Sequence, residues 1–156
     1  MQAGDPELSR ALQKAGRLLA RRAHSRAEIE ARLRGAGFDD GVVARAVERL
    51  AEHCLVDDVE MATAWVAERR VRRSPAALAA ELGDKGIAGD VIERAVGELD
   101  EYADARAAAL RLHRKVAGRP LAKQGASLFG MLVRRGYAAE AAEAAVRSVL
   151  PPQGWD

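Results

Sequence analysis

Aromatic residues and long apolar runs are scarce in this sequence. Aromatics make up 4% of the 156 residues, and the 49% that are hydrophobic are mainly alanine, leucine and valine. That composition favours helices over a β-sheet. The longest uncharged stretch runs from Gln124 to Val133, about half of the roughly 20 residues that a membrane-spanning helix needs. We therefore expect no transmembrane segment.

Cysteine is almost absent too, and this bears on the compartment. The single Cys54 cannot form an internal disulfide. Residues 1–7 lack the basic and apolar regions of a secretory signal. Both features predict a cytoplasmic protein. We expect Cys54 to be a small core residue and Trp65, which has apolar neighbours, to lie in the core rather than form a stacking platform.

The residue clusters that enzymes use are missing. His24, His53 and His113 are far apart in the sequence, and no group of cysteines accompanies them, which argues against a zinc site. No glycine-rich loop ends in Lys-Ser or Lys-Thr, so we expect no nucleotide binding. Asp57 and Asp58 stand where a helix is expected to start, and capping explains them better than metal ligation. The sequence predicts a non-enzyme without catalytic residues, cofactor or metal.

Charge is segregated along the chain although the net charge is only +2. Residues 10–34 hold eight basic and two acidic residues, and residues 105–135 hold eight basic and none acidic. Residues 81–104 between them hold two basic and eight acidic residues. Such a chain can present basic surfaces to a polyanion or to an acidic protein, although solvated helix faces rich in arginine are the simpler explanation of any one block.

A pattern of about fifty residues occurs three times. Each copy has an apolar stripe, a glycine and a large apolar residue; the equivalent pairs are Gly37-Phe38, Gly86-Ile87 and Gly136-Tyr137, spaced 49 and 50 residues apart. A second apolar stripe follows at the same offsets, at Val42, Val47 and Leu50, at Val91, Val96 and Leu99, and at Ala141, Val146 and Val149. Glycine permits the left-handed turn that ends a helix. Each copy therefore predicts helix, glycine turn, helix.

A further helix is expected upstream of each pair, at about 6–22, 57–72 and 100–117. Helix-start signals support this layout: Asp5-Pro6, Ser25 with Glu28, Asp57 with Glu60, and Ser74-Pro75. We predict an all-α fold of three tandem three-helix repeats that form an elongated, curved array of either hand; a compact bundle is the alternative. The expected boundaries are a disordered 1–5, repeats at 6–54, 55–99 and 100–150, and a frayed tail at 151–156.

Basic side chains cluster where the upstream helices end. The expected binding residues are Arg17, Arg21, Arg22, Arg26, Arg69, Arg70, Arg72, Arg73, Arg111, Arg114 and Lys115. The helix dipole favours one or two cations at each end, which does not account for so many. Arginine can grip phosphate or carboxylate in two places. Because aromatics are nearly absent from these runs, any nucleic-acid contact would be to the backbone and independent of sequence.

The order of these motifs resembles that of the RecX regulatory family over about residues 18–150. The resemblance is carried by residues 19–28, Gly37-Phe38, Leu55-Val56-Asp57-Asp58, Pro75, Leu78, Glu81-Leu82, Lys85-Gly86-Ile87 and Arg134-Arg135-Gly136-Tyr137. It implies a regulator, expected to be a monomer, that lodges in the groove of the RecA recombinase filament and touches successive protomers. It further implies weak contact with the bound DNA. Such a regulator mainly inhibits the ATPase, filament growth and strand exchange of RecA in recombination, DNA repair and the SOS response.

Two other functions stay open at this stage. A helix, a glycine turn and a helix can form a stand-alone DNA-binding protein with helix-turn-helix geometry. However, the helix expected at 41–51 has Arg45 and Arg49 beside Glu48 and no Asn or Gln for reading adenine. A purely structural helical adaptor is the third possibility.

Overall fold

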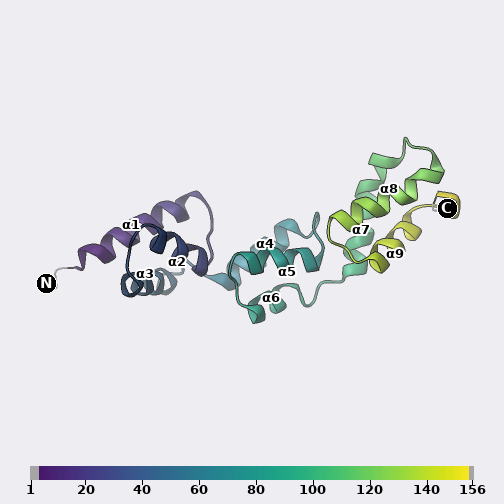
Figure 1. The fold of residues 1–156 in the computed structure, drawn as a ribbon. Helices are drawn as coiled ribbons and strands as arrows, with labels where there is room; N and C mark the ends of the chain where they lie inside the picture. Colours follow the sequence, from purple (N-terminus) through teal and green to yellow (C-terminus); the bar gives the residue numbers. More distant parts are fainter. Residues whose placement is uncertain (1–3, 155–156) are drawn as a thin grey trace. The chain divides into compact units, whose positions relative to one another are not determined.

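The computed structural model describes residues 4–154, and these residues form nine α-helices and no strand. The helices are α1 (Pro6–Arg21), α2 (Arg26–Gly35), α3 (Asp40–Glu52), α4 (Asp58–Arg69), α5 (Pro75–Asp84), α6 (Gly89–Val96), α7 (Glu101–Val116), α8 (Leu121–Arg134) and α9 (Ala139–Val149) (Figure 1). One 3₁₀ turn, η1 (Pro152–Gly154), follows. The expected all-α fold of three-helix repeats is confirmed.

The predicted helix starts are present. Asp5, Ser25, Asp57 and Ser74 each accept a hydrogen bond from a backbone amide two or three residues further on, at 3.0 to 3.4 Å. Each bond satisfies an amide that has no partner within its helix. Asp58 caps a different helix, because its Oδ1 accepts a bond of 2.9 Å from the amide of Arg26 at the start of α2. Both aspartates of this pair therefore cap helices.

The three glycine turns are alike. Gly37, Gly86 and Gly136 have φ angles of 93°, 75° and 94°. The amide that follows each glycine donates to the carbonyl of a buried leucine in the preceding helix; the pairs are Phe38 to Leu33, Ile87 to Leu82 and Tyr137 to Leu132, at 3.2 to 3.3 Å. This bond closes a Schellman motif. The repeat seen in the sequence is thus a repeated backbone geometry.

The chain divides into two compact units. Unit 1 contains residues 1–64 and 82–92, and unit 2 contains residues 65–81 and 93–156. The division passes through the middle copy rather than between copies. The repeat boundaries expected at 54/55 and 99/100 therefore stay predictions.

Each unit has its own apolar core. In unit 1, Ile29 and Leu33 of α2 pack among buried residues of α1 and α3, including Ala15 and Val47. In unit 2, Leu128 and Leu132 of α8 occupy the same place between α7 and α9. In the middle copy the predicted stripe is only half-buried, because α6 is short and has no fully buried residue.

Two core predictions are wrong. Cys54 is exposed and has a φ of 56°, because it forms the left-handed end of α3 rather than a helical position. Trp65 is half-buried, and its ring carries the guanidinium of Arg69 at 3.7 Å from the ring centroid. Of the frayed tail expected at 151–156, residues 152–154 form η1, which packs against α8, and residues 155–156 lie outside the described part. Of the expected disordered segment 1–5, residues 1–3 lie outside the described part, and Asp5 caps α1.

The turn at Gly86, the second glycine turn of unit 1, carries a partly buried polar cluster. Glu28 accepts from Arg22 at 2.8 Å and from Lys85 at 3.3 Å, and the hydroxyl of Ser25 donates to the carbonyl of Lys85. Burial raises the pKa of Glu28, but the hydrogen bond from Arg22 and the charges of Lys85 and Arg22 outweigh burial and leave this pKa below its ordinary value. Ionised Glu28 therefore stabilises the folded chain.

This cluster predicts a pH-dependent stability. The contribution of Glu28 is fully present above about pH 5 and is lost as the pH falls through the ordinary glutamate pKa of about 4.3 towards the lowered folded value. Glu28→Gln should lower the free energy of unfolding by about 1 kcal/mol at pH 7 and flatten its decline below pH 5. Urea titrations at several pH values measure both effects. Glu48→Gln, whose side chain is 61% exposed, is the control and should change little; an unaltered pH profile for Glu28→Gln would contradict the assignment.

The core of unit 2 predicts a sharp contrast between two neighbouring residues. Leu132 is fully buried, whereas Val133 is 43% exposed. Leu132→Ala removes buried methyl groups and leaves a cavity, so it should cost about 2 to 5 kcal/mol of unfolding free energy. Val133→Ala should cost less than about 1 kcal/mol. Chemical denaturation followed by circular dichroism measures both, and equal losses would show that this core is wrongly placed.

Candidate functional site

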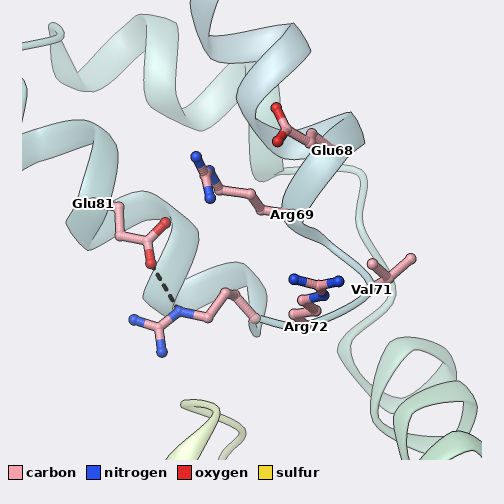
Figure 2. Close-up of a pocket in the computed structure, with 6 residues that line it drawn as sticks. Glu68, Arg69, Val71, Arg72 and Glu81 are labelled. Carbon is pink, nitrogen blue, oxygen red and sulfur yellow. Dashed lines mark hydrogen bonds and ion pairs between the residues drawn. The ribbon is translucent and has the colours of Figure 1, made fainter.

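Two adjacent hollows in unit 2 collect most of the predicted binding residues. The first, here called the arginine pocket, has a volume of about 280 Å³ and is lined by Glu68, Arg69, Val71, Arg72, Arg73 and Glu81 (Figure 2). The second, here called the cationic groove, has a volume of about 680 Å³ and is lined by Val71, Arg72, Ala108, Arg111, Leu112, Arg114, Lys115 and Arg135. Val71 and Arg72 belong to both, so both hollows border the same turn.

That turn corrects a sequence prediction. The cluster at 69–73 is predicted at the end of a helix running to about residue 72, but α4 ends at Arg69. The amides of Arg72 and Arg73 both donate to the carbonyl of Arg69, at 2.9 and 3.0 Å, which reverses the chain before Pro75 begins α5. Arg70, Arg72 and Arg73 therefore lie on a turn rather than along one helix side.

The arginine pocket has a mixed charge. Glu81 of α5 accepts from Arg73 Nε at 2.7 Å and from Trp65 Nε1 at 2.9 Å, and the ion pair with Arg73 is drawn in Figure 2. Arg69 extends over the Trp65 ring, a cation–π contact, and its buried Nε has no hydrogen-bond partner. The pocket thus combines one neutralised arginine with an arginine that retains an unused donor.

The cationic groove has no acidic residue in its lining. Its five cations are Arg72, Arg111, Arg114, Lys115 and Arg135. Arg114 and Lys115 are exposed and form no ion pair within residues 4–154. Like charges gathered in a concave surface raise the local positive potential and attract anions. Val71, Ala108 and Leu112 supply an apolar part of the lining.

Three hydrogen bonds hold the turn beside the third copy. Arg111 Nη2 donates to the carbonyl of Val71 at 2.6 Å, and Arg135 Nη1 donates to the carbonyl of Arg72 at 3.3 Å. The amide of Ser74 donates to the carbonyl of Arg135 at 3.0 Å. The groove is therefore assembled from the α4–α5 turn, from α7 and from the end of α8.

Arg70 is unavailable to a partner that approaches the groove. Its Nη2 pairs with Asp104 Oδ1 of α7 at 2.9 Å, and the Asp104 side chain is only 12% exposed.

Burial raises the pKa of Tyr137, and the negative charge of Asp104 raises it further. Tyr137 is therefore a neutral hydroxyl at physiological pH.

The predicted basic cluster of unit 1 is less free than expected. Arg22 pairs with Glu28 at 2.8 Å, and Arg26 pairs with Glu48 at 2.9 Å. Arg17 and Arg21 are exposed on α1. Of the eleven predicted residues, Arg72, Arg111, Arg114 and Lys115 share the cationic groove, and Arg69, Arg72 and Arg73 share the arginine pocket.

Sequence reasoning missed Arg135, Glu81 and Trp65 as parts of this surface. Arg135 was visible in the basic block and stands just before Gly136, in the place that Lys85 occupies before Gly86. Aligning the copies could have flagged it. The hydrogen bonds from Trp65 and Arg73 to Glu81 span 16 and 8 residues, and no local sequence pattern predicts them.

Within residues 4–154, no group of three or more His, Cys, Asp or Glu side chains could hold a metal ion. No helix in that range has the length and apolar character needed to cross a membrane.

Comparisons with known proteins agree with the repeated fold. Sequence profiles for the first and second three-helix domains of RecX match residues 11–50 and 57–96. The regulatory protein RecX of Mycobacterium avium strain 104 is 40% identical over 127 residues, which cover 78% of this chain and 73% of that protein. That of Mycobacterium tuberculosis strain ATCC 25177 / H37Ra is 41% identical over 130 residues, 78% of this chain and 75% of that protein.

A crystal structure extends the likeness to three dimensions. The RecX of Lactobacillus salivarius superposes with a TM-score of 0.76 over 92% of this chain and 96% of that chain, at 16% sequence identity, which shows a shared fold. The two matched profiles and the mycobacterial relatives show the family: this chain belongs to the RecX family of regulatory proteins.

Proposed function

We propose that this chain binds the nucleoprotein filament of the RecA recombinase and restrains it. It lowers the DNA-dependent ATPase, filament growth and strand exchange, and so limits recombination and repair during the SOS response. The observation that supports this proposal most directly is a groove whose lining contains five cations and no acidic residue, in a protein with the RecX fold. The protein acts as a cytoplasmic, monomeric, non-catalytic regulator.

The chemistry of the surface suits such a filament. A nucleoprotein filament presents phosphates and acidic side chains at regular intervals, and arginine binds both through paired donors. The lining of the groove contains no aromatic residue, so contact with DNA is made to the backbone and does not depend on sequence. Weak contacts repeated along a filament add up to useful avidity only after the filament has assembled.

A stand-alone helix-turn-helix function has less support. On α3, Arg45 is paired with Asp5 at 2.6 Å, and Glu48 is paired with Arg26 at 2.9 Å. Arg45 is therefore a poor candidate for reading base edges, because its charge is committed to an intramolecular pair.

Charge reversal in the groove tests the proposal. Arg114→Glu with Lys115→Glu changes two exposed cations that pair with no carboxylate in the described part of the chain, so the fold should remain intact. The concentration that halves the single-stranded-DNA-dependent ATPase of RecA should rise at least about tenfold, which corresponds to about 1.4 kcal/mol of binding free energy.

The matched control is Arg94→Glu with Arg106→Glu. Both residues are exposed and line neither hollow, and the change in net charge is the same. This control should inhibit within about twofold of the unaltered chain. Equal loss in both double variants would mean that net charge matters rather than the groove. Unaltered inhibition by the groove variant would refute the assignment of the site.

A further inference from the structure

The three equivalent glycine turns differ in what packs against them. A Cβ placed on Gly37 would meet nothing within 4 Å. On Gly86 it would lie 2.5 Å from the Cβ of Ala27, and on Gly136 it would lie 2.6 Å from Ser74 Oγ and 2.8 Å from the Cβ of Ala77. Two of the three turns therefore need glycine for close approach as well as for φ.

The same element makes the approach in both cases. Ala27 lies in the first turn of α2, just after its cap Ser25, and Ala77 lies in the first turn of α5, just after its cap Ser74. Each capping serine also donates to the carbonyl that precedes the glycine: the Ser25 hydroxyl to Lys85, and the Ser74 amide to Arg135. The start of one helix thus packs on the glycine turn of the next copy.

In unit 2 this contact lies next to the cationic groove. Ser74 is two residues beyond Arg72, and Gly136 directly follows Arg135, so the approach of Ser74 to Gly136 brings these two arginines together. The resulting position allows Arg135 to donate to the carbonyl of Arg72 and Arg111 to donate to that of Val71.

We infer that Gly136 is a positioning residue of the cationic groove, which acts by admitting Ser74 and Ala77 so that Arg72 faces the same hollow as Arg111 and Arg135. The inference rests on the proposed function for its biological readout, but the geometry can be tested without RecA. Gly86 is the natural comparison. It has a similar contact in unit 1, next to the Glu28–Lys85 ion pair, and it lines neither hollow.

Gly136→Ala and Gly37→Ala form a matched pair. Their φ angles are 94° and 93°, so the cost of placing alanine in the left-handed region is the same. Only Gly136→Ala pushes the start of α5 away. We expect Gly136→Ala to raise the half-inhibitory concentration for the RecA ATPase at least about fivefold and to speed trypsin cleavage after Arg72 and Arg73. Gly37→Ala should leave the half-inhibitory concentration and the cleavage rate within about twofold of those of the unaltered chain.

Ala77→Leu provides a second route should Gly136→Ala fold poorly. It fills the same space from the α5 side, keeps the glycine and has a good helix propensity. Its control is Ala27→Leu, which crowds Gly86 instead. Thermal melting by circular dichroism shows whether each variant is folded and whether the two pairs lose similar stability. We expect only the variants at Gly136 to expose the 70–73 turn to trypsin and to weaken inhibition.

The outcomes separate this inference from the proposed function. Cleavage of the turn at the rate of the controls in both Gly136→Ala and Ala77→Leu overturns the inference. A second result also overturns the inference: the Gly136 variants are cleaved faster but inhibit RecA normally, while Arg114→Glu with Lys115→Glu abolishes inhibition. The proposed function then stands. If that charge-reversed variant inhibits normally, the proposed site has failed, and accelerated cleavage confined to the Gly136 variants still supports the geometric part.

Discussion

The close approach of a helix start to a glycine turn is the constraint on which the described structure depends. Cys54 ends α3 with a φ of 56°, inside the small left-handed region that residues with a Cβ can adopt, whereas the three turn glycines have φ angles of 75° to 94°. Backbone conformation alone accounts for glycine at position 37. At positions 86 and 136 the neighbouring copy adds a second reason, because its helix start leaves no room for a Cβ. The same residue type can thus occupy equivalent positions of a repeat for different physical reasons.

Electrostatic pairing, rather than the number of arginines, determines which cations remain available. Four arginines each have a carboxylate within 2.9 Å, and these intramolecular partners largely neutralise their charge; they are Arg22, Arg26, Arg70 and Arg73. Arg114 and Lys115 have none among residues 4–154, and no acidic residue lies between positions 105 and 135 of the sequence. A free cation loses little when it binds an external anion, whereas a paired one must first give up its partner.

Local features were predictable and long-range pairings were not. Helix starts can be predicted at Ser25, Asp57 and Ser74, because a capping side chain accepts a hydrogen bond from an amide only three residues away. The glycine turns were visible because the same geometry recurs three times. By contrast, Arg70 to Asp104 and Arg111 to Val71 span 34 and 40 residues, and the sequence does not say which carboxylate or carbonyl a given arginine will meet. The end of α4 at Arg69 belongs to this second class, because bonds to the third copy hold the turn that follows.

The groove also shows why a single three-helix copy would not provide this surface. Arg72 belongs to the turn of the middle copy, whereas Arg111, Arg114, Lys115 and Arg135 belong to the third. Their convergence depends on hydrogen bonds in which arginines of one copy donate to backbone carbonyls of another. Two of the five groove cations thus serve twice, since Arg111 and Arg135 use one donor group on the turn and keep the rest of the guanidinium for an anion. Lysine in their place, with its point charge, could not offer this division of donors in a fixed plane.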